Sequence, residues 1–91
     1  MVPRHVQISE CGKDGVTVAD GDEIFSVKAE ALAGNGWNVP DSPGGMKSSI
    51  VLQVTGQLHG GLGLKDPELG HEYWVSGTGL GTSGCTPVKK T

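Results

Sequence analysis

The fold is decided by the stretch Val16-Thr-Val-Ala-Asp-Gly-Asp-Glu-Ile-Phe-Ser-Val-Lys28. Apolar and polar residues alternate on both sides of Asp20-Gly21, and such alternation is typical of half-buried strands. Asp-Gly is a favoured two-residue hairpin turn, because both of its positions tolerate a positive φ. The stretch therefore predicts a β-hairpin with Phe25 and Val27 on one face of its second strand.

The hairpin extends toward the N-terminus into a meander. Val6-Gln-Ile-Ser9 alternates in the same way, and Lys13-Asp-Gly15 has the composition of a turn. We expect three strands in the first 30 residues. The end of the third is ambiguous, because Ser26 to Gly34 also contains good helix formers and a terminal glycine. A strand to about Lys28 is expected there, and a short helix near 28–33, of one or two turns up to Ala33, can close it.

Two further strands are expected in the second half of the chain, at 49–58 and 72–77. Gly56 interrupts the first of them and indicates a bulge or a close backbone approach. The chain holds 16 glycines among 91 residues, and the Gly-rich segments 35–48, 60–70 and 79–84 are expected to be loops or irregular. We expect an all-β fold of five to six strands, as a small antiparallel sandwich or a partly open barrel.

The length fits one domain, which we place at 1–84, followed by a flexible C-terminal tail at 85–91. Seven basic and ten acidic residues give a net charge of −3, and the densest basic cluster is Lys89-Lys90. Binding to nucleic acid is therefore not expected.

No apolar run approaches membrane-spanning length, so no membrane association is expected. The N-terminus lacks an apolar signal core, which favours a cytoplasmic or virion-associated protein over a secreted one, unless a signal has been removed.

Cys11 and Cys85 are the only cysteines and lie near opposite ends of the chain. A bridge between them would enclose nearly the whole domain and could stabilise it by roughly 4 kcal/mol in the chain-entropy model. Without a signal peptide we favour two free thiols in a reducing compartment. If Glu10 and Asp14 lie close to Cys11, its pKa is expected to rise.

The run Gly79-Leu-Gly-Thr-Ser-Gly84 matches the dinucleotide-binding pattern of glycines. That motif requires a following helix to receive the pyrophosphate, and only seven residues remain after Gly84. We reject the dinucleotide interpretation, predict an irregular segment there and expect no cofactor. Gly61-Leu-Gly-Leu-Lys65 could form an anion-binding nest, but a hairpin connection is the commoner use of such a run.

Two candidate metal sites are weak. His59, His71 and Glu72 could meet across a hairpin, but adjacent strand residues point to opposite faces, so His71 and Glu72 cannot both chelate from one strand. The acidic turn at 20–23 lacks the ligand spacing of an EF-hand loop. No serine or threonine sits in a nucleophile elbow or beside a histidine, and we expect no enzyme activity.

Trp37 and Trp74 are the strongest candidates for a binding surface. Trp74 is predicted on the strand face opposite Tyr73 and Val75, and an exposed tryptophan often marks a contact with a partner or a sugar ring. Asn35 and Asn38 flank Trp37 and are included as candidate binding residues. The alternative is that Trp37 folds over Trp74 and builds a second small core.

These features favour a non-catalytic structural or interaction module that acts through loops and edge strands. A viral or phage coat or decoration component is one such module, and a protein partner or self-association is expected. A secreted, disulfide-stapled domain that binds a carbohydrate or another ligand is the first alternative. A small metal-dependent enzyme that uses His59, His71 and Glu72 is the second.

Overall fold

The computed structural model describes residues 3–58 and 60–87. Within these residues the chain forms short strands and two short helices. In chain order they are β1 (Arg4–Gly12), β2 (Gly15–Asp20), β3 (Glu23–Lys28), α1 (Ala29–Ala33), β4 (Trp37–Asn38), β5 (Gln53–Leu58), β6 (Gly61–Lys65), β7 (Glu72–Val75), α2 (Gly77–Thr82) and β8 (Thr86–Pro87). The all-β fold class predicted from the sequence is confirmed, as is a short helix near 28–33.

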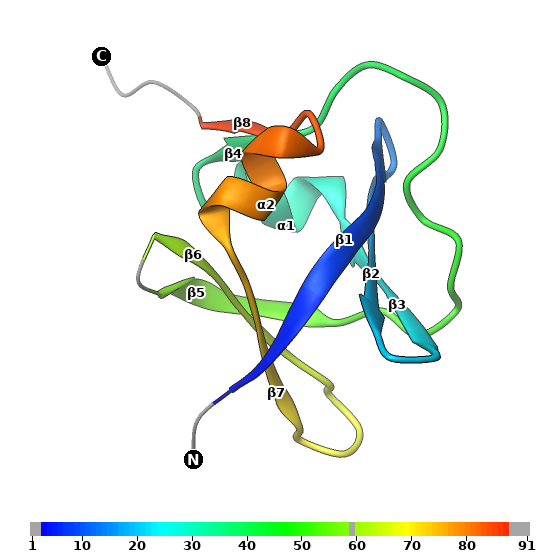
Figure 1. Ribbon diagram of the computed structural model, residues 1–91, viewed down its shortest axis with the longest axis vertical. Helices are drawn as coiled ribbons and strands as arrows, with labels where there is room; N and C mark the ends of the chain where they lie inside the picture. Colours follow the sequence, from blue (N-terminus) through cyan, green and yellow to red (C-terminus); the bar gives the residue numbers. More distant parts are fainter. Residues whose placement is uncertain (1–2, 59, 88–91) are drawn as a thin grey trace.

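Six of the strands form one curled sheet in the order β3-β2-β1-β7-β6-β5 (Figure 1). Its two ends meet at a parallel bridge between Ser26 and Val51. The Ser26 amide donates to the Ile50 carbonyl, and the Leu52 amide donates to the Ser26 carbonyl, each at 2.8 Å. The sheet is therefore a partly open barrel, one of the two architectures predicted.

Besides the Ser26–Val51 bridge, the pairing of β1 with β7 departs from the antiparallel pattern that the sequence predicted. β1 runs parallel to β7, with Val6 opposite Val75. Parallel neighbours need a long crossover, and here β2 to β6 supply it in place of a helix.

The hairpin of β2 and β3 is confirmed, but its turn is displaced by one residue. Asp20 pairs with Glu23, so Gly21 and Asp22 form the turn rather than Asp20 and Gly21. Gly21 has φ +62°, which is the conformation that such a tight turn requires of its first residue. The predicted inward face is also correct, because Phe25 and Val27 are buried.

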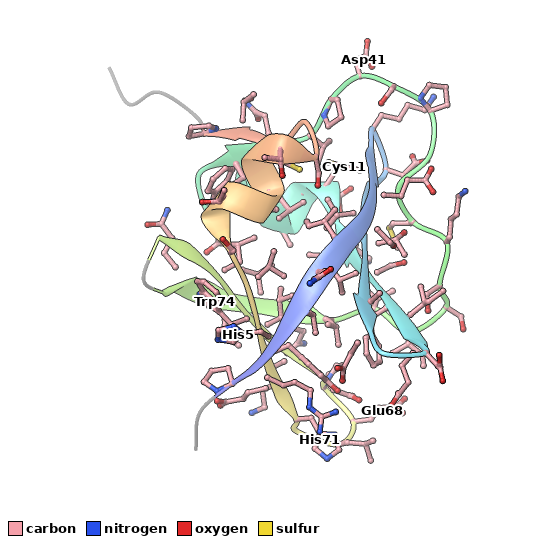
Figure 2. The ribbon with its side chains drawn as sticks, viewed as in Figure 1. His5, Cys11, Asp41, Glu68, His71 and Trp74 are labelled. Atoms are coloured by element: carbon pink, nitrogen blue, oxygen red, sulfur yellow. The ribbon has the colours of Figure 1, made fainter. Side chains whose placement is uncertain are left out.

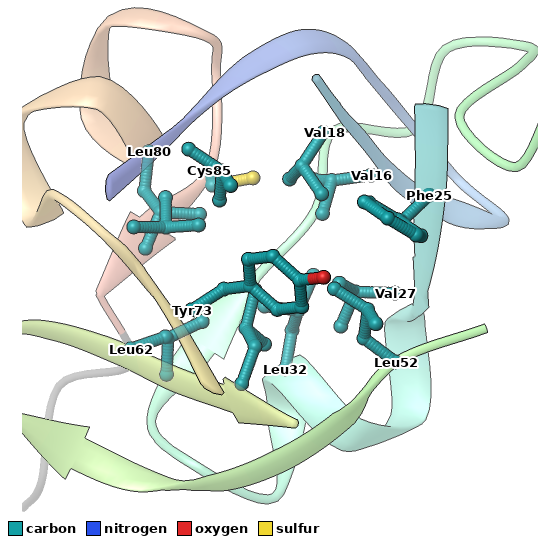
Figure 3. Close-up of a cluster of buried hydrophobic side chains, with 13 residues drawn as sticks. Val16, Val18, Phe25, Val27, Leu32, Leu52, Leu62, Tyr73, Leu80 and Cys85 are labelled. Atoms are coloured by element: carbon teal, nitrogen blue, oxygen red, sulfur yellow. The ribbon is translucent and has the colours of Figure 1, made fainter. Parts of the chain in front are cut away.

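The barrel encloses a cluster of apolar side chains, shown in Figure 3. Both helices contribute to it, since Leu32 of α1 and Leu80 of α2 are fully buried. The cluster consists of Val6, Val16, Val18, Phe25, Val27, Leu32, Leu52, Leu62, Leu64, Tyr73, Val75, Leu80 and Cys85. Sequestering these side chains from water is the main source of stability in a domain of this size.

Two segments predicted to be loops are ordered elements. Gly61–Lys65 is strand β6, and its side chains Leu62 and Leu64 are both buried. Gly77–Thr82 is helix α2, whose first turn is capped by the Ser76 hydroxyl accepting from the Thr78 amide at 3.2 Å. Among the described residues, no helix is long and apolar enough to cross a membrane.

The long segment between β4 and β5 is held against β1, β2 and β3. The buried Thr17 hydroxyl donates to the Gly45 carbonyl, and the Ser48 amide donates to the buried Ser26 hydroxyl at 3.0 Å. A Cβ on Gly45 would overlap the Gly15 carbonyl oxygen, so glycine is needed where the two backbones cross. This loop is therefore fixed by buried hydrogen bonds.

The beginning of the predicted tail belongs to the packed domain. Cys85 is fully buried, and its amide donates to the Leu80 carbonyl at 3.0 Å. β8 (Thr86–Pro87) pairs with β4 (Trp37–Asn38) in a small second sheet. Residues 85–87 of the expected flexible tail are therefore packed against the domain, and residues 88–91 lie outside the described residues.

Candidate functional site

The described residues form an open groove of about 890 Å³. One side comes from β3 and from residues 49–51, which lead into β5. The other side comes from β7 and the turn 66–71 that connects it to β6. The β2–β3 and β6–β7 hairpins both project at the lower end of the molecule in Figure 1, away from α2 and β8. We call this hollow the hairpin groove.

Two buried rings form the floor of the hairpin groove. Phe25 comes from β3 and Tyr73 from β7, and their ring centroids lie 5.3 Å apart at an interplanar angle of 41°. Both side chains line the groove and also belong to the core, with exposed fractions of 2% and 6%. The floor is therefore as rigid as the core itself.

Exposed apolar side chains stand on both sides of the groove. Ile50 is 47% exposed and Leu69 is 70% exposed. Scattered apolar residues are ordinary on a surface, but apolar side chains gathered around a hollow indicate a binding site. Leu69 is also a single apolar residue at the tip of a polar turn, where it contributes little to burial.

The turn that carries Leu69 is held by one buried carboxylate. Asp66 Oδ1 accepts from the amides of Glu68 at 2.8 Å and Leu69 at 3.2 Å. The Asp66 amide donates to the His71 carbonyl at 2.9 Å, and the Gly70 amide donates to the Asp66 carbonyl at 2.8 Å. This network fixes the backbone of the turn, so Leu69 is held in place before any partner arrives.

The groove is acidic. Glu23, Asp66, Glu68 and Glu72 line it, and the cation beside them, Arg4, is already paired with Asp20 at 2.9 Å. Asp20 also raises the pKa of Arg4, through their hydrogen bond first and their charges second.

The same negative charges affect the pKa of Tyr73. Burial raises it most, and the negative charges of Glu23, Asp20 and Asp66 raise it further. Ionising the Tyr73 hydroxyl is thus opposed by carboxylates from both sides of the groove.

Two of the weak metal candidates from the sequence lie on this groove. His71 and Glu72 are exposed and line its β7 side; Figure 2 labels His71 and Glu68 there. His59 lies outside the described residues. Within residues 3–58 and 60–87 no group of three or more histidine, cysteine, aspartate or glutamate side chains is placed to hold a metal ion.

The tryptophans lie away from the groove. Trp74 is on the face opposite the buried Tyr73 and Val75, as predicted, but it is only half-exposed. The ring of His5 lies 4.7 Å from it (Figure 2). Trp37 is half-buried and packs against the main core.

The asparagines beside Trp37 have different surroundings. The Asn35 side chain donates to the Ala31 carbonyl at 2.7 Å, and the Asn35 carbonyl accepts from the Gln57 side chain at 2.9 Å. Asn38 is exposed and pairs with Thr86 in the small sheet. Asn35 is therefore occupied in holding the end of α1.

The two cysteines are free thiols. Burial raises the pKa of both, to about 12 for Cys85. The predicted direction for Cys11 is correct, but the cause is burial rather than the neighbouring carboxylates.

Sequence reasoning missed the hairpin groove. The sequence predicts a strand over 49–58, in which Ile50 and Leu52 would share one face. The structure buries Leu52 and leaves Ile50 exposed, because residues 50–52 bond to β3 before β5 begins. The one available signal was Leu69, an apolar residue isolated within Lys65-Asp-Pro-Glu-Leu-Gly70.

Comparison of the chain with protein-family models, with curated proteins and with solved structures gave no match.

Proposed function

We propose that this chain is a non-catalytic interaction module that binds an extended segment of a partner protein in the hairpin groove. The segment carries lysine or arginine together with aliphatic side chains. The observation that supports this most strongly is Leu69, which is 70% exposed and yet held in place by the hydrogen bonds of Asp66 beside an acidic hollow.

The shape of the groove favours an extended peptide. It is open to solvent and lies between strand β3 on one side and a hairpin turn on the other. Ile50 and Leu69 offer contacts for aliphatic side chains from opposite sides of the groove. A chain that places alternate side chains into such a hollow gains affinity from apolar burial without a change in the module.

The charge of the groove favours a basic segment. Glu23, Glu68 and Glu72 are exposed carboxylates around the hollow, and Arg4 is engaged by Asp20. Complementary charge selects the partner and speeds encounter, whereas an acidic segment would meet like charge.

A positional-scanning library of short peptides tests the proposal on the intact protein, with fluorescence polarisation as the readout. We expect the library to select lysine or arginine at some positions and leucine, isoleucine or valine at others. The test variants are Leu69→Ser and Glu68→Lys, because both side chains are exposed. Each substitution is expected to weaken binding of the selected peptide about tenfold, equivalent to about 1.4 kcal/mol. Glu30→Lys is the matched control, because Glu30 is exposed on α1 and does not line the groove.

Three results would overturn the proposal. They are selection of acidic peptides, no selection at all, and equal binding by the Leu69→Ser, Glu68→Lys and Glu30→Lys variants. Light scattering on the same proteins tests whether the chain self-associates. A dimer that forms with rising concentration and is abolished by Leu69→Ser would mean that a second copy, not another protein, occupies the groove.

A further inference from the structure

Two nearly buried polar side chains line the hairpin groove and keep an oxygen without a protein partner. Tyr73 is 6% exposed and Asp66 is 7% exposed. Among the described residues the Tyr73 hydroxyl makes no hydrogen bond, and both amides that bond to the Asp66 carboxylate use Oδ1. Every side-chain nitrogen or oxygen of these residues that is closed off from solvent does have a partner. The Tyr73 oxygen and Asp66 Oδ2 are therefore open to solvent.

The strand register places these two side chains next to each other. Leu64 of β6 pairs with Tyr73 of β7, and Asp66 follows Leu64 by two residues. The Asp66 amide donates to the His71 carbonyl at 2.9 Å, which continues the pairing of the two strands. Side chains two residues apart on a strand share a face, so Asp66 and Tyr73 are diagonal neighbours on the inner face of this hairpin.

The charges around these oxygens favour a cation. Glu23 lies on the same face of β3 as Phe25, whose ring packs against Tyr73, so Glu23 lines the groove from the opposite side. Arg4 also lines the groove, but its charge is offset by Asp20, with which it is paired at 2.9 Å. The uncompensated charge beside the Tyr73 hydroxyl is therefore negative.

We infer that the hairpin groove holds a lysine side chain of the bound segment, whose ammonium group donates to the Tyr73 oxygen and to Asp66 Oδ2. We call these two oxygens the lysine subsite. The inference rests on the proposed function and identifies the place at which the basic residue of the segment is recognised.

The subsite suits an ammonium group better than a guanidinium group. An ammonium directs its hydrogens to separate acceptors, whereas a guanidinium favours the two oxygens of one carboxylate. Asp66 has a single oxygen to offer, because Oδ1 already accepts from the amides of Glu68 and Leu69. We therefore expect lysine to be preferred over arginine.

The apolar walls of the groove suit the rest of a lysine side chain. Lysine buries its hydrocarbon stem along apolar surface while its charged end keeps polar partners. Phe25, Ile50 and Leu69 line the groove and supply such a surface. Apolar walls beside two free oxygens match a lysine rather than a free inorganic cation.

The first test is an NMR titration of the ¹⁵N-labelled protein with n-butylammonium, which has the hydrocarbon stem and the ammonium group of lysine. We expect shifts of the Asp66 and Tyr73 amides, and smaller shifts with n-butylguanidinium at the same concentration. Tyr73→Phe keeps the ring and should remove most of the response. Equal responses to the two cations, or a response at Glu30 as large as that at Asp66, would overturn the inference.

The second test measures binding of a short peptide of alternating lysine and leucine by fluorescence polarisation. Tyr73→Phe and Asp66→Asn each weaken a hydrogen bond to a charged group, so each should lower the affinity about tenfold. Glu30→Gln is the matched control, because it removes one negative charge from an exposed residue outside the groove. Replacing the lysines by arginine should also lower the affinity about tenfold.

The two tests distinguish a failure of the lysine subsite from a failure of the proposed function. If the peptide binds Tyr73→Phe as tightly as wild type, or if arginine replaces lysine without loss, the subsite is wrong and the proposed function stands. If n-butylammonium binds at Asp66 and Tyr73 but no basic peptide binds, the reverse holds. If neither binds, both are overturned. The titration of the wild-type protein decides the matter even if a variant does not fold.

Discussion

The rings of Phe25 and Tyr73 pack 5.3 Å apart across the barrel, joining β3 to β7. These two strands are not neighbours in the sheet, since β2 and β1 lie between them. The contact therefore fixes the distance between the two sides of the hairpin groove. Because the groove floor belongs to the core, the shape of the binding surface depends on the same packing that stabilises the fold.

Phe25→Ala is expected to lower the free energy of unfolding by about 3–5 kcal/mol, because it removes a buried ring and leaves a cavity. Ile24→Ala is the matched control. Ile24 is the adjacent residue and is 50% exposed, so its truncation should cost less than about 1 kcal/mol. Chemical denaturation of both variants measures the difference. Equal losses would show that β3 does not present Phe25 to the core.

Thr17→Val tests how the long loop is held. The buried Thr17 hydroxyl donates to the Gly45 carbonyl and accepts from the Lys47 amide at 3.3 Å. Valine keeps the volume but leaves both loop groups without that partner, at a cost of about 1–3 kcal/mol. Amide exchange in 44–48 should accelerate, whereas Thr55→Val, on an exposed strand residue, should leave it unchanged. Unchanged exchange in Thr17→Val would mean that other contacts hold the loop.

Two substitutions of Asp66 distinguish the effect of its hydrogen bonds on the turn from the effect of its negative charge. Asp66→Ala removes the acceptor for the amides of Glu68 and Leu69 and should lower the free energy of unfolding by about 1–3 kcal/mol. Asp66→Asn keeps an acceptor oxygen and should lose less than half as much. Denaturation curves of the two variants measure this. If Asp66→Asn loses as much free energy of unfolding as Asp66→Ala, then the charge of Asp66, and not its hydrogen bonds, stabilises the turn.

The raised pKa of Cys85 predicts a loss of stability in alkali. The thiol titrates at about 9 when unfolded and at about 12 when folded. Above pH 9 the unfolded state releases this proton first, so the free energy of unfolding falls as pH rises toward 12, by at most about 1.4 kcal/mol per pH unit. Under reducing conditions, wild type should lose stability more steeply than Cys85→Ala over this range. An equal pH dependence of the free energy of unfolding in wild type and Cys85→Ala would contradict the raised pKa of Cys85.

The sequence predicted those elements whose side-chain pattern agrees with their backbone. In the β2–β3 hairpin, alternation, turn residues and strand-forming side chains all indicate the same structure. Gly56 indicates a bulge or a close backbone approach, and the β5–β6 register does shift between Val54 and Gly56.

The missed elements are those in which tertiary contacts outweigh local preference. Gly77–Thr82 has three glycines and little intrinsic helix propensity, yet it is helical because Leu80 is buried and Ser76 caps the first turn. Gly61 and Gly63 gave the β6 segment the composition of a loop, so the sequence did not predict this strand. A Cβ on Gly61 would overlap the Val75 carbonyl oxygen and crowd the Trp74 ring, and one on Gly63 would overlap the Thr55 hydroxyl, so neighbouring atoms occupy the space that strand side chains normally fill.

The candidate site could not be predicted for a related reason. The hairpin groove joins residues from β3, from 49–51 and from the 66–71 turn, which become neighbours only when the sheet curls. The strongest sequence signals for binding were the two tryptophans, and both are partly covered by intramolecular contacts.

The most direct test of the proposed function is an NMR titration of the ¹⁵N-labelled protein with a short peptide of alternating lysine and leucine. A peptide of alternating glutamate and leucine is the control. We predict that the lysine peptide shifts the amides of 23–25, 49–51 and 66–73, and that the glutamate peptide shifts none of them. Shifts confined to the surface around Trp37 and Trp74, or equal responses to both peptides, would contradict the assignment of the hairpin groove as the binding surface.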